Sequence, residues 1–260
     1  MNPGVPTENR VGRSVGIIGA GRLGLVVARH ALASGYQVRI TASAAPGRPL
    51  ERLGPRVTVT SPSSVAEGVE VVILAVPFHR FRELPLGCLA GHIVVDAMNH
   101  WPSVDETIIG FDSTTPTSVL VGRALPSDVL LVKALNHLSY HQLRDRARPP
   151  AAPDRIALAV SGDDPGAVAR IEDLVTDLGF DPVAAGSLDS SDRQQPGSLL
   201  FGSILDASTM RHLLDIGAPP AGVGAGLPMS RRERRAGTPT ACCESPLAAG
   251  NPNVRFRPVP

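Results

Sequence analysis

The sequence has 260 residues, of which 43% are hydrophobic, and this length fits one large domain or a domain with a small appendage. The net charge of +1 and the aromatic content of 3% argue against nucleic acid as a partner, which would require a basic, base-stacking surface. The longest apolar run, 71–76, is too short to span a bilayer. The start lacks signal-peptide features, and the three cysteines fit free thiols in a reducing cytoplasm, where we expect the protein.

Apolar runs and helical periodicity predict strands that alternate with helices along the first half of the chain. The first strand covers residues 14–18, and the first helix covers residues 22–34 and stops at Gly35. The next predicted elements are strands over 37–41 and 56–60, a helix that starts at Ser61-Pro62, strands over 70–76 and 93–95, a helix over 117–125 and a strand over 129–135.

After a loop rich in Pro and Arg at 144–153, the alternation resumes once. A strand over 155–160, a helix over 164–178 and a strand over 180–184 are expected, followed by a last helix over 206–215. Residues 217–260 are rich in Pro, Gly, Ala and Arg and have no apolar period. We expect a disordered tail there, with a functional basic tail as the alternative.

The strands are near-continuous runs of Val, Ile and Leu, which predicts burial on both faces. The predicted fold is therefore α/β, a Rossmann-type doubly wound, mainly parallel sheet with a small C-terminal βαβ extension. We expect a dinucleotide-binding domain over 11–150, a small α/β extension over 151–216 and the tail over 217–260. No internal repeat is visible.

The segment Gly19-Ala20-Gly21-Arg22-Leu23-Gly24 follows the first strand and opens the first helix. In this context GxGxxG is typical of a dinucleotide-binding turn. Gly19 would make the tight turn, Gly21 would let a pyrophosphate approach the backbone, and Gly24 would let the helix pack closely on the sheet. Free N–H groups at the helix start, around Arg22 and Leu23, would bind the anion. A glycine-rich turn without a ligand is the alternative.

The end of the second strand distinguishes NAD from NADP, because NAD-binding proteins usually place an acid there. Residues 40–48 contain no acid. Thr41 and Ser43 can donate to a 2′-phosphate, and Arg22 or Arg48 can neutralise it, so the pattern favours NADP. The alternative is that these are ordinary loop residues.

The fourth strand ends at Ala75-Val76-Pro77, and ligands of parallel sheets bind outside the carboxyl ends of the strands. We therefore expect this turn to lie against the cofactor. His79 could contact the cofactor as well, and a solvent-exposed loop histidine is the equal alternative.

Several polar residues follow the later strands. Lys133 lies in an apolar strand, and its ammonium is expected to reach the strand end or a carboxylate such as Asp96, with a structural ion pair as the default. His137 and His141 could share a helical face, but no third ligand accompanies them, so no metal site is expected. Tyr140 could be the proton donor of a carbonyl or imine reductase, or it could pack or cap a loop.

No catalytic triad is evident, and we assign no catalytic side chain. This fits hydride transfer between two planar carriers, in which the cofactors supply the chemistry and the protein supplies orientation and a dry gap.

With these residues in place, the chain resembles the NADP oxidoreductases that depend on coenzyme F-420, the 8-hydroxy-5-deazaflavin. The similarity spans about residues 13–215, and the more specific segments are Lys133-Ala134-Leu135-Asn136-His137 and Ser161-Gly162-Asp163-Asp164-Pro165. The other similar segments are 15–24, 71–77, which holds Ala75, Val76 and Pro77, and 94–99, which ends at Asn99.

The resemblance implies that a hydride passes between NADPH and the deazaflavin. It assigns the pyrophosphate to Gly19, Gly21 and Gly24 and the 2′-phosphate to Ser43, although Ala44 stands where the archaeal enzymes have an arginine. It further implies that Asn136, His137 and Leu138 line the pocket where nicotinamide and deazaflavin stack.

We assign Asn99 to the cofactor and Tyr140 to the substrate. Three functions stay open at this point. They are an NADPH:deazaflavin oxidoreductase, an NADPH-dependent reductase of a small carbonyl or imine substrate, and a non-catalytic NADP-sensing module. The expected partners are a small-molecule cofactor and a hydride acceptor, without nucleic acid or membrane, and a homodimer is left open.

Overall fold

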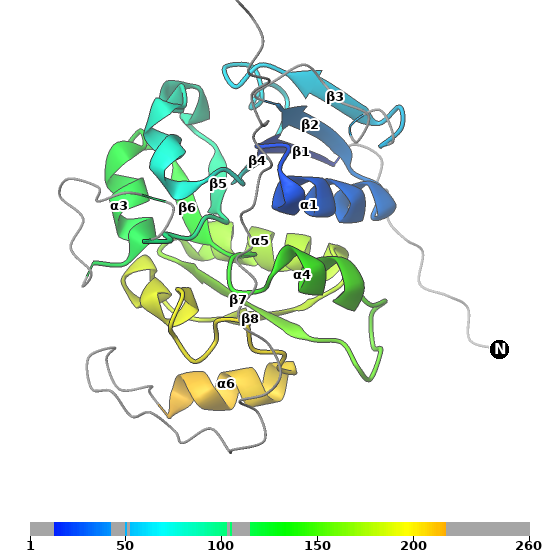
Figure 1. The fold of residues 1–260 in the computed structure, drawn as a ribbon, viewed down its shortest axis with the longest axis vertical. Coiled ribbons are helices and arrows are strands. Elements are labelled where there is room, and N and C mark those ends of the chain that lie inside the picture. Colours follow the sequence, from blue (N-terminus) through cyan, green and yellow to red (C-terminus); the bar gives the residue numbers. More distant parts are fainter. Residues whose placement is uncertain (1–12, 43–49, 51–52, 103–104, 106–114, 217–260) are drawn as a thin grey trace, which may run out of the picture. The chain divides into compact units, whose positions relative to one another are not determined.

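The computed structural model describes residues 13–42, 50, 53–102, 105 and 115–216, and an eight-stranded sheet runs through them (Figure 1). The strand order is β3-β2-β1-β4-β5-β6-β7-β8, and every neighbouring pair is parallel except β6 and β7. The strands are β1 (Ser14–Ile18), β2 (Gln37–Thr41), β3 (Val57–Thr60), β4 (Val71–Leu74), β5 (Ile93–Asp96), β6 (Leu130–Lys133), β7 (Ala157–Gly162) and β8 (Asp181–Ala184). The first six strands have the order of the doubly wound dinucleotide-binding fold, so the predicted fold class is confirmed.

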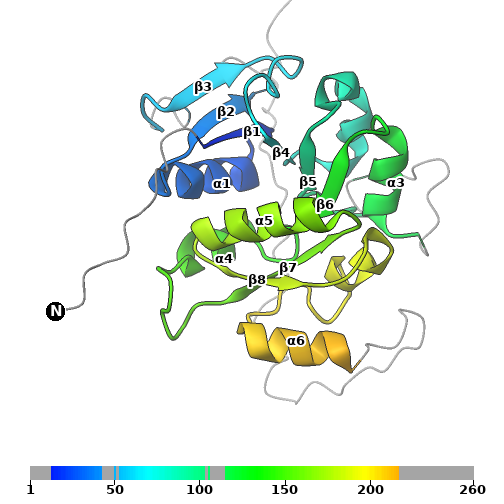
Figure 2. The same ribbon diagram turned by 180° about the vertical axis from the view of Figure 1, so that it is seen from behind.

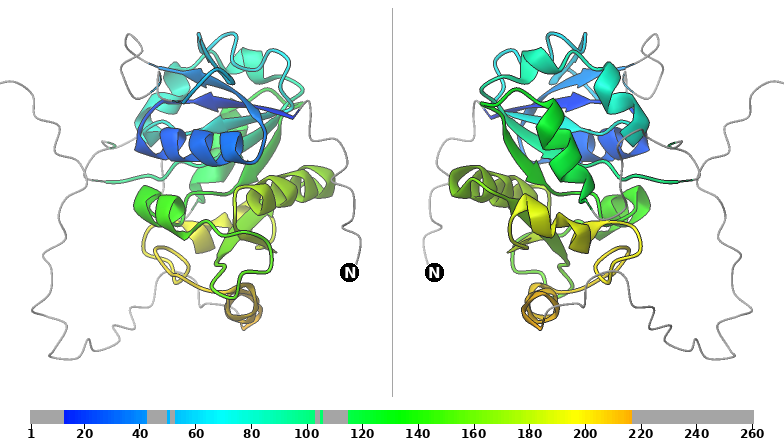
Figure 3. Two further views of the ribbon diagram at one scale, coloured as in Figure 1. Left: turned by 90° about the vertical axis from the view of Figure 1, so that its right-hand side faces the viewer. Right: turned by 90° about the vertical axis from the view of Figure 1, so that its left-hand side faces the viewer.

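Helices cover both faces of this sheet (Figures 1 and 3). The described helices are α1 (Arg22–Ala33), α3 (Thr117–Ala124), α4 (Tyr140–Arg146), α5 (Pro165–Asp177) and α6 (Ala207–Asp215), with 3₁₀ helices η1 (Phe78–Glu83), η2 (Leu86–Leu89) and η3 (Leu188–Gln194). Among the described residues, no helix is both long enough and apolar enough to cross a membrane.

Neighbouring residues of one strand supply two different hydrophobic cores, because side chains alternate across a sheet. Ile17 packs into the core that α1 and α5 cover, whereas Ile18 packs into the core on the opposite face, which α3, η1 and η2 cover. All four residues of β4 are buried. The near-continuous apolar runs therefore have the cause that the sequence predicts, which is burial on both faces.

The C-terminal βαβ unit extends the same sheet. Strand β7 pairs antiparallel with β6, so that Lys133 lies opposite Ser161. Figure 2 shows α5 lying along β7 and β8, and α6 packs on these strands through a small core that contains Met210. The boundary between residues 150 and 151 stays a prediction, and the predicted disordered tail, 217–260, lies outside the described residues.

Two predictions of helices need correction. The helix expected from Ser61-Pro62 is wrong. Residues 62–68 form successive turns with hydrogen bonds between residues three apart, and Gly68 has a positive φ of 68° that ends them. Helix α4 was not expected, although its sequence carries a capping box. The Ser139 hydroxyl accepts from Gln142 N–H at 3.2 Å, and the Gln142 amide oxygen accepts from Ser139 N–H at 2.8 Å.

The side chain of His137 ties the loop after β6 to β7. The ring is fully buried, and its Nε2 accepts a hydrogen bond from Ala159 N–H at 3.0 Å. Nε2 therefore carries no proton in the neutral ring. Burial lowers the pKa of His137 from 6.5 to about 4, because the charged imidazolium would lose its hydration.

We expect the free energy of unfolding to fall as the pH drops from about 6.5 to about 4. In this window His137 is protonated in the unfolded chain and neutral in the folded protein. The stabilisation that comes from its lowered pKa is therefore fully present above the pKa of the unfolded state, and it is lost as the pH falls to the pKa of the folded state. The loss is on the order of 3 kcal/mol. Urea unfolding near neutral pH and near pH ~4.5 measures it.

The matched variant is His137→Gln, whose amide oxygen can still accept from Ala159 N–H. It should lose this part of the pH dependence. His30, whose pKa burial also lowers, is present in both proteins, so the comparison isolates His137. An unchanged pH dependence in the variant would show that the ring of His137 is not held neutral by burial.

Candidate functional site

The predicted site residues that the structure describes gather at the carboxyl ends of the parallel strands. Gly19 follows β1, Thr41 ends β2, and Ala75 follows β4, while Asn99 and Asn136 come after β5 and β6. Strands β1 and β4 are neighbours at the point where the strand order reverses. In open α/β sheets this edge, at this switch point, is where ligands bind.

Two glycines of the first turn are required by the protein itself. Gly19 has a φ of +116°, and a Cβ there would collide with the carbonyl oxygen of Ala75. A Cβ at Gly24 would collide with the carbonyl oxygen of Gly19. These close approaches bring the turn against the end of β4 and bring α1 down onto the turn.

Gly21 is different, because neither its backbone nor its neighbours require glycine. Its φ is −73°, and a Cβ built there would meet no heavy atom within 4 Å. Gly21 is the N-cap of α1 and offers no side chain to the first N–H groups of the helix. An open space in front of uncapped helical N–H groups fits a phosphate, so the turn fits the pyrophosphate of a dinucleotide.

Thr41 holds this turn from the second strand. Its hydroxyl oxygen accepts a hydrogen bond from Gly19 N–H at 3.1 Å, and its side chain is buried. The predicted contact of Thr41 with a 2′-phosphate stays a prediction. Ser43 and Arg48, which are predicted to bind the same phosphate, lie outside the described residues.

The structure brings Arg22 and Tyr140 together at the start of α1. Arg22 Nη1 donates to the Tyr140 hydroxyl at 2.9 Å, and the guanidinium carbon lies 5.4 Å from the centre of the Tyr140 ring. The side chain of Leu23, next in the chain, packs against the core. The predicted phosphate ligand and the predicted proton donor thus bind one another, and they join α1 to α4 beside the turn.

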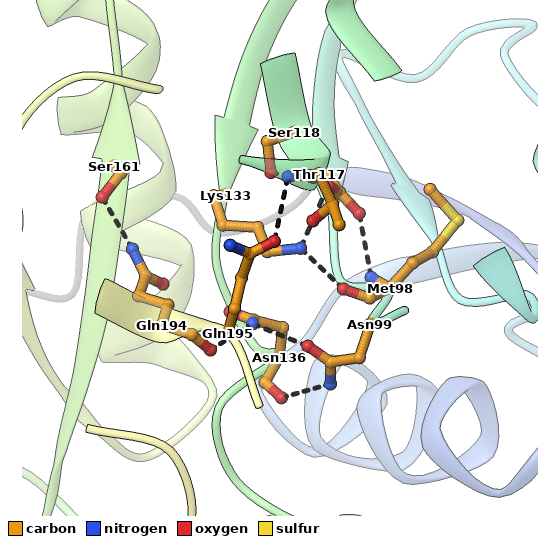
Figure 4. Close-up of polar contacts among 10 residues, drawn as sticks. Met98, Asn99, Thr117, Ser118, Lys133, Asn136, Ser161, Gln194 and Gln195 are labelled. Atoms are coloured by element: carbon orange, nitrogen blue, oxygen red, sulfur yellow. Dashed lines mark hydrogen bonds and ion pairs between the residues drawn. The ribbon is translucent and has the colours of Figure 1, made fainter. Parts of the chain in front are cut away.

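A buried polar network fixes the loops after β5 and β6 (Figure 4). The expected ion pair is confirmed, because Lys133 Nζ lies 3.1 Å from Asp96 Oδ2 and both side chains are fully buried. Burial lowers the pKa of Lys133, and the carboxylate of Asp96 opposes this. Lys133 also donates to the carbonyl of Met98 at 2.6 Å, and Ser118 donates to Asp96 Oδ2 at 2.7 Å.

Asn99 and Asn136 form a reciprocal pair in this network. Asn99 Nδ2 donates to the carbonyl oxygen of Asn136 at 2.8 Å, and Asn136 Nδ2 donates to Asn99 Oδ1 at 3.0 Å and to the carbonyl of Gln194 at 2.8 Å. The preceding residue, Leu135, is buried with a φ of +64°. Such a conformation is strained for leucine and is typical of functional turns.

Asn136 Oδ1 is buried and has no hydrogen-bond partner among the described residues. Its amide nitrogen already makes two hydrogen bonds, so the oxygen is the free end of the side chain. A donor from a bound ligand or water would complete it.

The side chains of His137 and Leu138 are both buried, and the His137 ring binds the backbone of β7. The predicted place of these residues beside the nicotinamide and the deazaflavin stays a prediction. The predicted shared helical face of His137 and His141 is wrong, because α4 begins at Tyr140. Among the described residues, no group of three or more His, Cys, Asp or Glu side chains could hold a metal ion.

His79 binds a residue that the sequence did not indicate. Its Nδ1 lies 2.6 Å from Oδ1 of Asp105, which is a buried carboxylate. The contact of Asn136 with the carbonyl of Gln194, in η3, was also not expected. The His79–Asp105 and Asn136–Gln194 contacts both join residues far apart in the chain, and no local sequence pattern marks either contact.

These residues match a known family. Residues 14–100 fit the family described as NADP oxidoreductase, coenzyme F-420-dependent. The match covers about a third of the chain. The match holds the glycine turn, the ends of β2 and β4, and Asn99.

Individual relatives extend the comparison. Protein YjhV of Escherichia coli (strain K12) is 45% identical over 62 residues, which are 24% of this chain and 45% of that protein, so the chain spans less than half of this curated relative. The hypothetical protein SMa0349 of Sinorhizobium meliloti is similar in structure, with a TM-score of 0.62 and 28% identity over 74% of this chain and 94% of that one.

A third relative is similar in fold alone. It is a candidate F-420-dependent NADP reductase of Arthrobacter, with a TM-score of 0.55 and 24% identity over 70% of this chain and 87% of that one.

Replacement of Gly21 by valine should weaken dinucleotide binding by roughly 100-fold or more, because the side chain would displace the pyrophosphate from at least two charge-assisted hydrogen bonds. The fold should be unaffected, since the side chain points into open space. Equilibrium binding of NADPH and the urea midpoint measure the two effects.

Gly87→Val is the matched control, because a Cβ at Gly87 also meets no atom within 4 Å and Gly87 lies in η2. It should bind NADPH as the unmodified protein does. Wild-type affinity in Gly21→Val would show that the pyrophosphate is not bound at this turn.

Proposed function

We propose that this protein is an NADP(H)-dependent oxidoreductase that passes a hydride between NADPH and the deazaflavin coenzyme F-420. The observation that carries the proposal is Gly21, which leaves open space in front of the uncapped start of α1, in a segment that fits this family. NADPH would supply the hydride when bound.

The cofactor would lie along the carboxyl ends of the parallel strands. Its phosphates would lie beside β1 and β2, and its nicotinamide would lie beside β5 and β6. The turn after β1 would bind the pyrophosphate, and the end of β2, with Thr41 and the predicted ligands Ser43 and Arg48, would bind the 2′-phosphate. Asn99 and Asn136 lie after β5 and β6, on the side of the nicotinamide in a doubly wound fold. Their mutual hydrogen bonds would keep the nicotinamide side rigid and leave Asn136 Oδ1 for a donor of the ligand.

The deazaflavin as the acceptor is supported by the description of the family and by the name of the Arthrobacter relative. We infer that the partners are this small-molecule pair and that the reaction takes place in the cytoplasm, without nucleic acid or membrane. A homodimer is compatible with the proposal. The alternatives are reduction of a small carbonyl or imine substrate and a non-catalytic NADP-sensing role.

Purified protein mixed with NADPH and oxidised coenzyme F-420 should bleach the visible absorbance of the deazaflavin. NADH in place of NADPH should be the poorer donor. Tight binding of NADPH without bleaching would contradict the deazaflavin coupling. Turnover of small imines or carbonyls would then favour the second function, and no turnover with either class would favour the NADP sensor.

A further inference from the structure

A buried carboxylate joins the segment after β4 to the segment after β5. Asp105 is 1% exposed, and both of its oxygens accept hydrogen bonds. Oδ1 accepts from His79 N–H at 3.1 Å and lies 2.6 Å from Nδ1 of the His79 ring. Oδ2 accepts from Trp101 N–H at 2.6 Å. Two backbone donors thus hold the carboxylate in place while it orients the ring.

This arrangement decides which nitrogen of His79 is available. Nδ1 must carry a proton to bind Asp105, so the lone pair of the neutral ring is on Nε2. The His79 side chain is 38% exposed, whereas its partner is buried. A buried carboxylate that fixes the tautomer of an accessible imidazole is the arrangement of a general acid–base pair.

The pair lies where a hydride acceptor would be expected. His79 comes two residues after Pro77, at the carboxyl end of β4, and its ring is turned to Asp105, which follows β5. These strands belong to the second half of the doubly wound sheet, the half of the nicotinamide. Trp101, whose N–H group binds the same carboxylate, is 44% exposed. Its ring packs edge-on against the ring of Phe201, with the ring centres 5.6 Å apart.

The other charged groups near His79 are engaged elsewhere. On its own element, Arg80 pairs with Glu83 at 3.1 Å, and Arg82 lies over the ring of Phe81. The His100 ring packs against Phe78 at 5.7 Å. Among the described residues, Asp105 is the charged group that bonds to the His79 ring.

We propose that His79 and Asp105 form an acid–base dyad that gives the hydride acceptor its proton, an inference that rests on the proposed function. As NADPH gives a hydride to a carbon of the acceptor and becomes NADP⁺, protonated His79 gives the Nε2 proton to the ring nitrogen, imine nitrogen or carbonyl oxygen that gains the electron pair. His79 becomes neutral and takes a new proton from water. Asp105 stays ionised throughout.

The first test is the rate of hydride transfer. His79→Gln should lower kcat by about 100-fold or more, with the Kd for NADPH unchanged. Asp105→Asn, which can still accept from Trp101 N–H, should lower kcat as well, because the His79 ring loses the carboxylate that orients it.

His212→Gln is the matched control, since His212 is exposed on α6. It should leave the rate unchanged. A His79→Gln protein with the wild-type kcat would overturn the dyad.

A second readout does not depend on turnover. In protein labelled with ¹⁵N-histidine, the ring of His79 should show the Nδ1–H tautomer, Asp105→Asn should disturb it, and NADP⁺ should shift its Nε2 resonance. If NADP⁺ shifts that resonance while the deazaflavin is not reduced, the proposed acceptor fails and the dyad stands. If NADP⁺ binds and leaves the His79 resonances unchanged, the dyad is overturned whether or not the deazaflavin is reduced.

Discussion

The buried ion pair between Lys133 and Asp96 fixes the loops that follow β5 and β6. Lys133 binds both the carboxylate of Asp96 and the carbonyl of Met98, so the chain is held at the point where it leaves β5. Asn99 comes next and binds Asn136, which follows the strained Leu135. Loss of one member of a buried ion pair costs about 3–5 kcal/mol, whereas an apolar pair of the same volume is often neutral. The pair therefore determines geometry more than net stability.

The two halves of the carboxyl edge are built by different physical means. In the first half, close approach of backbones at Gly19 and Gly24 leaves space at Gly21 for a ligand. In the second half, buried carboxylates fix the loops. Asp96 accepts a hydrogen bond from Met98 N–H after β5, and Asp105 binds His79 and Trp101. Rigid donors and acceptors of this kind suit a site whose chemistry comes from its cofactors.

The sequence predicted the features that depend on neighbours in the chain. Buried apolar runs located β1 and β2 to the residue, and the GxGxxG spacing located the turn and its helix. Lys133 in an apolar strand was sufficient to predict its ion pair. The turns after Ser61 were mistaken for a helix because a cap and a proline mark both structures, and α4 was missed although Ser139 and Gln142 form a capping box.

Apart from the ion pair of Lys133 with Asp96, which lies 37 residues away, features that depend on distant contacts were not predictable. The side chain of His137 turns into the core because Ala159, 22 residues away in sequence, offers an N–H group. His79 and Asp105 are 26 residues apart and belong to different crossovers, so no spacing marks them as a pair. Tyr140 meets Arg22 only because α4 packs on α1. Such contacts form only when the chain folds, so no pattern in a single sequence marks them.

The most direct test of the account uses Trp101, the one tryptophan of the chain, which binds Asp105 at the edge of the site. The reduced nicotinamide absorbs where tryptophan emits, so a bound NADPH should accept its excitation energy. Titration with NADPH should quench the tryptophan emission in a saturable way, with sensitised emission from the nicotinamide, and NADH should need a higher concentration. If NADPH leaves the tryptophan emission unchanged, or lowers it without saturation, the result would contradict a dinucleotide site at this edge of the sheet.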